Sequence, residues 1–178
     1  MGLALADCAK SLGAEVKLIT TKDVSREYDV IKVQSALDMK VAVEKEFNGA
    51  DCLIMAAAVA DYRVKETAEQ KIKKTDENEM TLTLVKNPDI LKEISSKKNN
   101  QIVVGFCAES ENLLENAKEK IAQKGCDYLI ANDISRKDIG FSSDYNEVVI
   151  LDKNGMIKKL ERADKMTIAR QILEAIYG

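Results

Sequence analysis

The chain has 178 residues, of which 32% are charged, and a formal net charge of −3. This charge argues against a nucleic-acid binder, because the phosphate backbone requires a cationic protein surface. The sequence contains no histidine, which excludes the usual general base and the commonest zinc ligand. We therefore expect the chemistry of this protein to depend on lysine, arginine, carboxylates and backbone dipoles.

The sequence also predicts a compartment. It has no apolar run that approaches the roughly 18 to 20 residues of a membrane span, and its first residues lack the pattern of a signal peptide. We predict a cytoplasmic protein that contacts no membrane. The cysteines show neither disulfide nor metal-ligand spacing, so we interpret all of them as reduced and buried: Cys8, Cys52, Cys107 and Cys126.

Helical and strand patterns alternate along the chain, as is typical of repeated βα units. The predicted helices are 3–12, 36–47 with Ser35 as the N-cap, 88–96, 112–124 and 165–177. The predicted strands are 15–20, 30–33, 52–58, 80–85, 102–106 and 128–133, followed by a hairpin of 148–151 and 156–160. The polar stretch 65–78 is expected to be a mobile loop.

These elements predict an α/β fold. We expect a three-layer, Rossmann-like, mainly parallel sheet with helices on both faces and a C-terminal β-hairpin. No repeat, low-complexity tract or linker divides residues 1–178, so we predict a single nucleotide-binding domain.

The most informative segment is AAAVADYR at residues 56–63. An apolar run delivers the carboxylate of Asp61 at its C-terminal end, and a lysine cluster follows within Lys71–Lys74. Ligands bind at the carboxyl ends of strands in open α/β sheets, and ammonium groups on a mobile loop stabilise developing phosphate charge. The layout fits a nucleoside triphosphate, and the alternative is a buried strand followed by a solvated loop.

Two later features suit an anion. Asn87, Pro88 and Asp89 form a helix-start signal, with Asn87 as the N-cap and proline at the first helical position. The free N–H groups of a helix end can bind phosphate, although the same residues are also ordinary capping. Lys120 and Lys124 project from one helix face, for which the alternative is a solvated surface.

Six short motifs follow one another along the chain. They are AAAVADYR at 56–63, QKIKK at 70–74, VKNPDIL at 85–91, VVGFCAE at 103–109, AND at 131–133 and GFSSDYN at 140–146. In this order they resemble phosphopantothenoylcysteine synthetase, the bacterial, CTP-using synthetase family of coenzyme A biosynthesis. The resemblance covers nearly the whole chain.

The resemblance implies a two-step ligase that uses CTP and Mg²⁺. The carboxylate of 4′-phosphopantothenate attacks the α-phosphate of CTP and expels pyrophosphate, and the amine of L-cysteine then displaces CMP from the acyl-cytidylate. A chain without histidine suits this chemistry, because nucleotidyl transfer depends on alignment and charge neutralisation. The residues by themselves leave the choice between CTP and ATP open.

The resemblance also assigns residues to the nucleotide. Lys71 corresponds to a family lysine that handles the activated intermediate, so we expect it to be catalytic. Asp61 is expected to bind the nucleotide directly or through a metal ion, whose ligands remain unknown at this stage. The expected nucleotide-binding residues are Met55, Ala56, Ala57, Asp61, Lys71, Pro88, Asp89, Ile90, Leu91, Phe106, Lys120 and Lys124.

The resemblance finally implies an assembly. In the family, a strand, an asparagine and a serine- and glycine-rich loop precede the helix that begins here at Met1 and Gly2. We therefore expect a domain that lacks the family's first strand and whose competence alone is in question. A homodimer with the hairpin 148–160 in contact, and a fused or associated flavin-dependent decarboxylase, are also implied.

Two other functions remain as alternatives. A non-catalytic nucleotide-binding or assembly module would bind CTP without releasing pyrophosphate. A nicotinamide-dependent dehydrogenase is disfavoured, because no G-x-G-x-x-G follows a strand in the sequence.

Overall fold

The structure is a computed structural model that describes residues 1–68, 70–73, 79–109, 111–133 and 143–178. The helices are α1 (Gly2–Ser11), α2 (Ala36–Phe47), α3 (Ile90–Lys97), α4 (Leu113–Lys124) and α5 (Lys165–Tyr177). The strands are β1 (Lys17–Thr20), β2 (Asp29–Lys32), β3 (Cys52–Met55), β4 (Tyr62–Val64), β5 (Leu84–Lys86), β6 (Ile102–Glu109), β7 (Tyr128–Asp133), β8 (Tyr145–Asp152) and β9 (Gly155–Asp164). Lys74 of the predicted lysine cluster and residues 140–142 of the GFSSDYN motif lie outside the described residues.

The central sheet has five strands in the order β3-β6-β7-β8-β9. β3, β6 and β7 are parallel, and the β8–β9 hairpin adds two antiparallel strands at one edge. β6 is apolar at successive positions because both of its faces are buried, as Val103 and Val104 show with 0% exposure each. The predicted α/β class and the C-terminal hairpin are confirmed, and both hairpin strands are longer than predicted.

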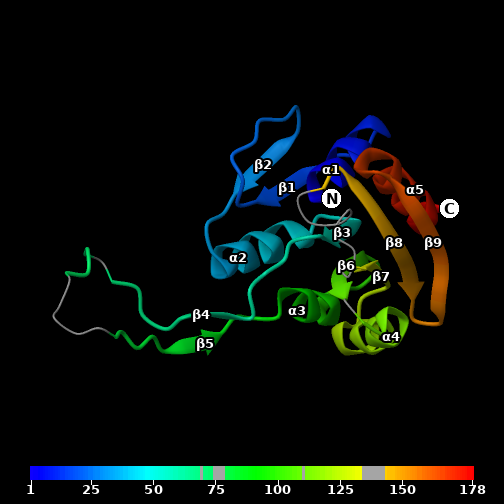
Figure 1. The fold of residues 1–178 in the computed structure, drawn as a ribbon. Helices are drawn as coiled ribbons and strands as arrows, with labels where there is room; N and C mark the ends of the chain where they lie inside the picture. The colour runs from blue at the N-terminus through cyan, green and yellow to red at the C-terminus, as the bar shows by residue number, and fades with distance from the viewer. Residues whose placement is uncertain (69, 74–78, 110, 134–142) are drawn as a thin grey trace.

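Helices cover both faces of the central sheet, so the three-layer arrangement is confirmed (Figure 1). On one face α2, α3 and α4 pack against alternate strand residues such as Val103 and Leu129. On the other face α1 and α5 pack against the residues between them, such as Val104 and Ile130. This division follows from the strand geometry, because successive side chains point to opposite faces. None of the described helices is long and apolar enough to cross a membrane.

Capping side chains set the helix starts. Ser35 caps α2 as predicted: its hydroxyl accepts a hydrogen bond from the Asp38 N–H, and the Asp38 carboxylate accepts one from the Ser35 N–H. The predicted start of α3 is wrong, because the N-cap is Asp89, whose carboxylate accepts a hydrogen bond from the Lys92 N–H. Pro88 therefore precedes the helix instead of occupying its first position.

Two short sheets lie outside the ladder of the central sheet. β1 and β2 form a parallel pair, and β4 and β5 form an antiparallel ribbon. Within the described part of the chain, neither pair is hydrogen-bonded to the central sheet. The ribbon begins an arm, described at 62–68, 70–73 and 79–86, that extends away from the body (Figure 1).

The arm departs from the sequence prediction. Only Leu84 and Val85 of the predicted strand 80–85 belong to β5, so most of that prediction is wrong. Alternating apolar residues favour a strand when one face is buried, whereas Met80 and Leu82 are 64% and 60% exposed. β4 was not predicted, and the stretch predicted as a loop has no helix or strand at 65–68 or 70–73.

Candidate functional site

A cavity of about 770 Å³ lies where β3 and β6 approach α3 and α4. This volume falls in the range of pockets that hold a small ligand. Its walls come from the segment that follows β3, from the start of α3, and from two lysines of α4. The lining residues are Met55, Ala57, Ala58, Val59, Ala60, Asp61, Tyr62, Lys86, Asn87, Pro88, Asp89, Ile90, Leu91, Phe106, Cys107, Lys120, Lys124 and Leu129.

The floor of this cavity is apolar and depends on a glycine. Phe106 of β6 and Leu91 of α3 line it together with Leu129 of β7. Gly105 lies directly beneath, where a Cβ atom would come within 2.6 Å of Leu91 Cδ2 and 3.1 Å of Leu129 Cδ1. Glycine therefore allows α3 to approach the sheet closely enough to close the floor.

Hydrogen bonds at the base of the arm fix the segment that carries Asp61. The Asn87 side chain donates to the Ala60 carbonyl at 2.8 Å, and the Asn87 N–H donates to the Asp61 carbonyl at 2.8 Å. The Arg63 guanidinium donates to the Lys86 carbonyl at 2.6 Å. These contacts join the chain after β3 to the chain before α3, so hydrogen bonds link the two sides of the cavity.

Both α4 lysines of the cavity are paired with carboxylates. Lys120 Nζ lies 2.5 Å from Glu109 Oε1, and Lys124 Nζ lies 2.6 Å from Asp89 Oδ2. The Lys124–Asp89 pair is open to solvent, with 32% and 40% of its side-chain surfaces exposed, and such a pair contributes little to stability, so Lys124 can exchange its carboxylate for a phosphate oxygen at small cost. Lys120 is 42% exposed but Glu109 only 11%, so the same exchange at Lys120 leaves a mostly buried carboxylate without its cation.

Lys120 stays charged in this setting. The hydrogen bond from its ammonium to Glu109 raises the pKa of Lys120 above its ordinary value, and the nearby charge of Asp61 adds a weaker attraction. Asp61 and Lys120 both line this cavity. A polyanion bound there would meet a permanent positive charge.

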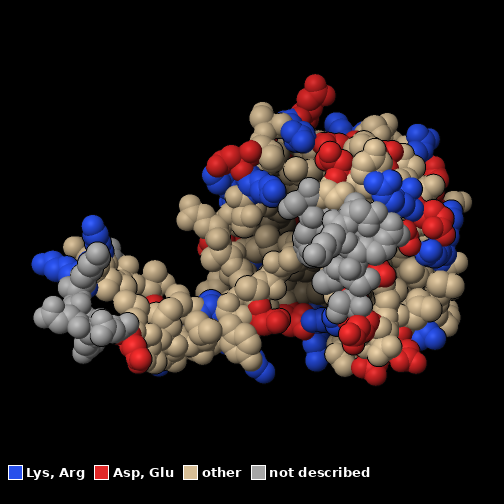
Figure 2. Space-filling view, viewed as in Figure 1, with Lys and Arg blue, Asp and Glu red and all other residues tan. Residues whose placement is uncertain are grey.

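The structure gathers most of the predicted site residues. All of them line this cavity except Ala56 and Lys71. Ala56 instead lines a larger neighbouring cavity of about 1650 Å³. Lys71 is exposed on the arm and lines neither cavity. Figure 2 shows the arm standing apart from the body, with positively charged side chains towards its far end.

Sequence reasoning missed several residues of the site. Glu109 could have been found from the sequence. It is a carboxylate at the end of the apolar run of β6, and polar residues at strand ends are candidates for a ligand site. Asn87 was assigned to capping, whereas its amide links the two walls. Cys107 also lines the cavity, and burial raises the pKa of its thiol to about 11, so the neutral thiol is an inert part of the wall.

The acidic groups of the cavity suit a magnesium ion that is held mainly by the substrate and only in part by the protein. Among the described residues, no group of three or more His, Cys, Asp or Glu side chains could enclose a metal. Mg²⁺ usually takes one or two protein carboxylates and completes its shell with substrate phosphates and water. Asp61, which lines the cavity, suits that role.

The whole chain matches one protein family, described as "DNA/pantothenate metabolism flavoprotein C-terminal domain", over residues 1–178. It is 42% identical over 182 residues to the coenzyme A biosynthesis bifunctional protein CoaBC of Borreliella burgdorferi, which covers 99% of this chain and 45% of the relative. CoaBC of Bacillus subtilis is 41% identical over 181 residues, which covers 99% of this chain and 44% of the relative. The chain thus spans less than half the length of these curated relatives.

Solved structures share the fold. The crystal structure of the C-terminal domain of CoaBC is 32% identical, with a TM-score of 0.79, and the match covers 98% of this chain and 79% of that chain. The DNA/pantothenate metabolism flavoprotein from Streptococcus pneumoniae has a TM-score of 0.78 at 22% identity, which shows the fold alone. Together these similarities confirm the mixed α/β architecture.

Proposed function

Because the chain belongs to the family of DNA/pantothenate metabolism flavoprotein C-terminal domains, we propose that it carries a phosphopantothenate–cysteine ligase activity in coenzyme A biosynthesis. The observation that carries this proposal is one shared cavity at which Asp61, the start of α3, and Lys120 and Lys124 of α4 meet. The nucleotide in the proposal is CTP. The identity to CoaBC over 99% of this chain supports the reaction class.

The first proposed step is formation of an acyl-cytidylate. A carboxylate oxygen of 4′-phosphopantothenate attacks the α-phosphorus of CTP, the bond to the β-phosphate oxygen breaks, and pyrophosphate leaves. Negative charge increases on the departing pyrophosphate. The ammonium groups of Lys120 and Lys124 are placed to neutralise that charge once they release Glu109 and Asp89.

The second proposed step is amide formation. The amine of L-cysteine attacks the acyl carbon, CMP leaves with the electrons of the acyl C–O bond, and the amine gives up one proton to water. The walls that are fixed at the base of the arm hold the nucleotide end of the intermediate in place, so orientation supplies part of the rate. In the first step Mg²⁺ would supply further charge neutralisation at the triphosphate, and Asp61 is the side chain that would hold it.

Lys71 is proposed to act on the activated intermediate. It lies on the arm, outside the cavity, so this role requires the arm to bring it to the nucleotide. Lys73 is an exposed lysine of the same segment and provides a matched control. A Lys71→Gln variant of the longest natural form of the protein is expected to release CMP and pyrophosphate much more slowly, while Lys73→Gln keeps its rate. Unchanged turnover in Lys71→Gln contradicts the assigned role.

A non-catalytic nucleotide-binding or assembly module remains the second candidate. The observation in its favour is the position of Lys71 away from the cavity. The two candidates differ in one measurement, made with 4′-phosphopantothenate, L-cysteine, CTP and Mg²⁺ together. Pyrophosphate release supports the ligase, whereas CTP binding without release in the longest natural form supports the module.

The remaining features of the proposal concern the oligomeric state of the protein and its cellular compartment. We propose a cytoplasmic homodimer that works with a flavin-dependent decarboxylase, fused or separate. Exposed apolar side chains on the arm, such as Leu84 at 54% and Tyr62 at 52%, support a second contact surface besides the β8–β9 hairpin. Sedimentation is expected to give twice the chain mass, and a monomer at micromolar concentration contradicts the dimer.

A further inference from the structure

A third lysine lines the candidate nucleotide cavity besides Lys120 and Lys124. It is Lys86, the last residue of β5, at the base of the arm. Neither the motifs of the sequence nor the resemblance to the synthetase family marked this residue for a role. Lys86 is exposed, so its ammonium keeps its full charge in water and is free to change its orientation.

The backbone around Lys86 is held in place. Its carbonyl accepts a hydrogen bond from the Arg63 guanidinium at 2.6 Å, and the N–H of the next residue, Asn87, donates to the Asp61 carbonyl at 2.8 Å. Lys86 is also paired with Tyr62 in the β4–β5 ribbon, and directly opposite residues of an antiparallel pair point to the same face. Because Tyr62 lines the cavity too, this face of the ribbon ends at the cavity.

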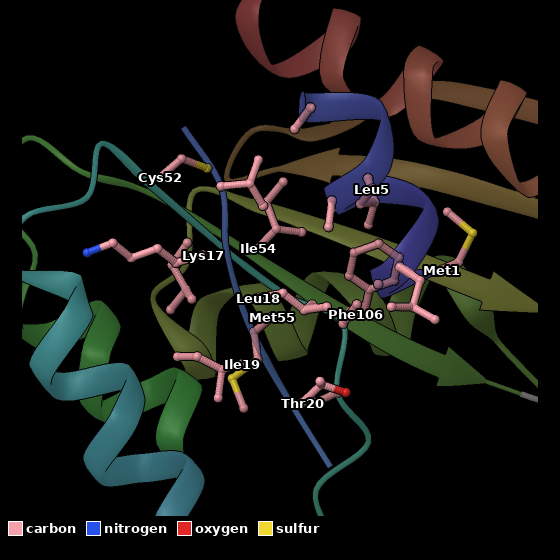
Figure 3. A pocket seen from close by; sticks show the side chains of 18 of the residues that line it. Met1, Leu5, Lys17, Leu18, Ile19, Thr20, Cys52, Ile54, Met55 and Phe106 are labelled. Carbon is pink, nitrogen blue, oxygen red and sulfur yellow. The ribbon is translucent and has the colours of Figure 1, made fainter. Parts of the chain in front are cut away.

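The boundary between this cavity and its larger neighbour supplies no positive charge. Met55 and Phe106 line both cavities, and Figure 3 shows them among the apolar side chains of the larger one, such as Ile54. None of the residues that line both cavities is cationic. Among the described residues, positive charge for a polyanion in the nucleotide cavity can therefore come only from α4 and from the base of the arm.

The three lysines differ in what a phosphate oxygen has to displace. Lys120 must leave Glu109, which is mostly buried, and Lys124 must leave Asp89. In the part of the chain that the structure describes, no carboxylate forms an ion pair with Lys86, so its ammonium has only water to leave. A charge-assisted hydrogen bond from Lys86 to a phosphate is thus gained without the loss of another ion pair.

We propose that Lys86 is a phosphate-binding residue of this cavity, whose ammonium donates a hydrogen bond to the phosphate chain of the bound ligand. The bond joins the base of the arm to the ligand, so a bound phosphate chain also stabilises the β4–β5 ribbon. That the ligand is a nucleoside triphosphate rests on the proposed function. The contact between Lys86 and a phosphate chain does not depend on it and can be tested separately.

The first test uses inorganic tripolyphosphate, which carries the phosphate chain without base or sugar, in titration calorimetry. Lys86→Gln should bind it about tenfold more weakly, as expected for the loss of one charge-assisted hydrogen bond, and Lys86→Arg should stay within about twofold of the unaltered protein. The matched control is Lys92→Gln, at an exposed lysine of α3 that lines neither cavity, and its affinity should not change. Equal affinities of Lys86→Gln and Lys92→Gln, or no binding to the unaltered protein, overturn the proposal.

The second test is hydrogen exchange at the amides of β4 and β5. Saturating tripolyphosphate should slow this exchange about fivefold in the unaltered protein and leave it unchanged in Lys86→Gln. Equal slowing in the two proteins overturns the proposal. The outcome is separable from that of the ligase: slowing that depends on Lys86, in a protein that releases no pyrophosphate from CTP, supports the phosphate contact and refutes the ligase. Pyrophosphate release by a protein whose tripolyphosphate binding does not depend on Lys86 supports the ligase and overturns the contact.

Discussion

Gly105→Ala is the substitution that links the packing of this fold most directly to its candidate site. Gly105 lies in β6, paired with Met55 of β3 on one side and Leu129 of β7 on the other. The new Cβ would lie 2.6 Å from Leu91 Cδ2, which is about 1 Å shorter than an ordinary carbon–carbon contact. Because Leu91 is only 8% exposed, its side chain must move within packed surroundings.

The expected cost has two parts. Overpacking of a buried site destabilises a protein by roughly 1–3 kcal/mol, so the free energy of unfolding in urea should fall by about that amount. Leu91 and Leu129 also form the floor of the nucleotide cavity, and the space into which they can move is the cavity itself. CTP affinity, measured by titration calorimetry, should therefore fall about tenfold, which corresponds to about 1.4 kcal/mol.

Gly49→Ala is the matched control for this prediction. A Cβ on Gly49 meets no atom within 4 Å, and its backbone is not in the left-handed region. The control should be at least as stable as the unaltered chain and should bind CTP equally well. If Gly105→Ala matches this control in both measurements, α3 does not approach the sheet as closely as the structure indicates.

Three further outcomes are expected. Ile130→Ala, at a residue with 0% exposure, should lower the free energy of unfolding by about 2–5 kcal/mol. The control Ile157→Ala, at a residue 45% exposed on β9, should change it by less than about 0.5 kcal/mol. Equal losses of stability in the two variants contradict the assigned core. Because burial raises the pKa of the Cys107 thiol from 9.0 to about 11, the stability that the neutral thiol contributes should be present below pH 9 and lost as the pH rises towards 11. Urea titrations of the protein and of Cys107→Ala across this range check the sign, and identical pH slopes contradict it. Glu109→Gln should tighten CTP binding by up to about fivefold, because Lys120 no longer has to leave a carboxylate; calorimetry that finds weaker binding shows instead that Glu109 positions the lysine.

Elements with strong local signals were predicted well. Ser35 and Asp38 form a capping box within four residues of chain, so the start of α2 could be predicted from sequence alone. β7 coincides with the predicted strand 128–133, because its apolar run is bounded at both ends by polar residues. In both cases the decisive interactions are local or follow from burial on both faces.

Elements that depend on distant contacts were predicted poorly. Asn87 and Asp89 are both good capping residues, and the choice between them follows from the bond between Asn87 and Ala60, which lies far away in the sequence. The alternation at 80–85 resembles a half-buried strand, but the arm offers it no covered face. Propensity cannot show whether a partner surface exists.

The candidate site was partly predictable for a general reason. Parallel strands bring their carboxyl ends to one edge of a sheet, which is why a ligand site was expected near Asp61. Phe106 was expected there only from the resemblance, and both residues line one cavity. The pairing of Lys120 with Glu109 depends on how α4 packs beside β6. The place of Glu109 at the end of an apolar run could have marked it as a site residue, but no spacing in the sequence encodes its contact with Lys120.

The most direct test of the central claim is the affinity for CTP of two variants of α4, measured by titration calorimetry. Lys120→Gln removes an ammonium that lines the cavity, and Lys118→Gln removes one from the exposed side of the same helix. We predict that the first variant binds CTP about tenfold more weakly, as expected for the loss of one charge-assisted hydrogen bond, and that the second binds like the unaltered protein. Equal CTP affinities for the two variants would contradict a triphosphate site between Asp61 and α4.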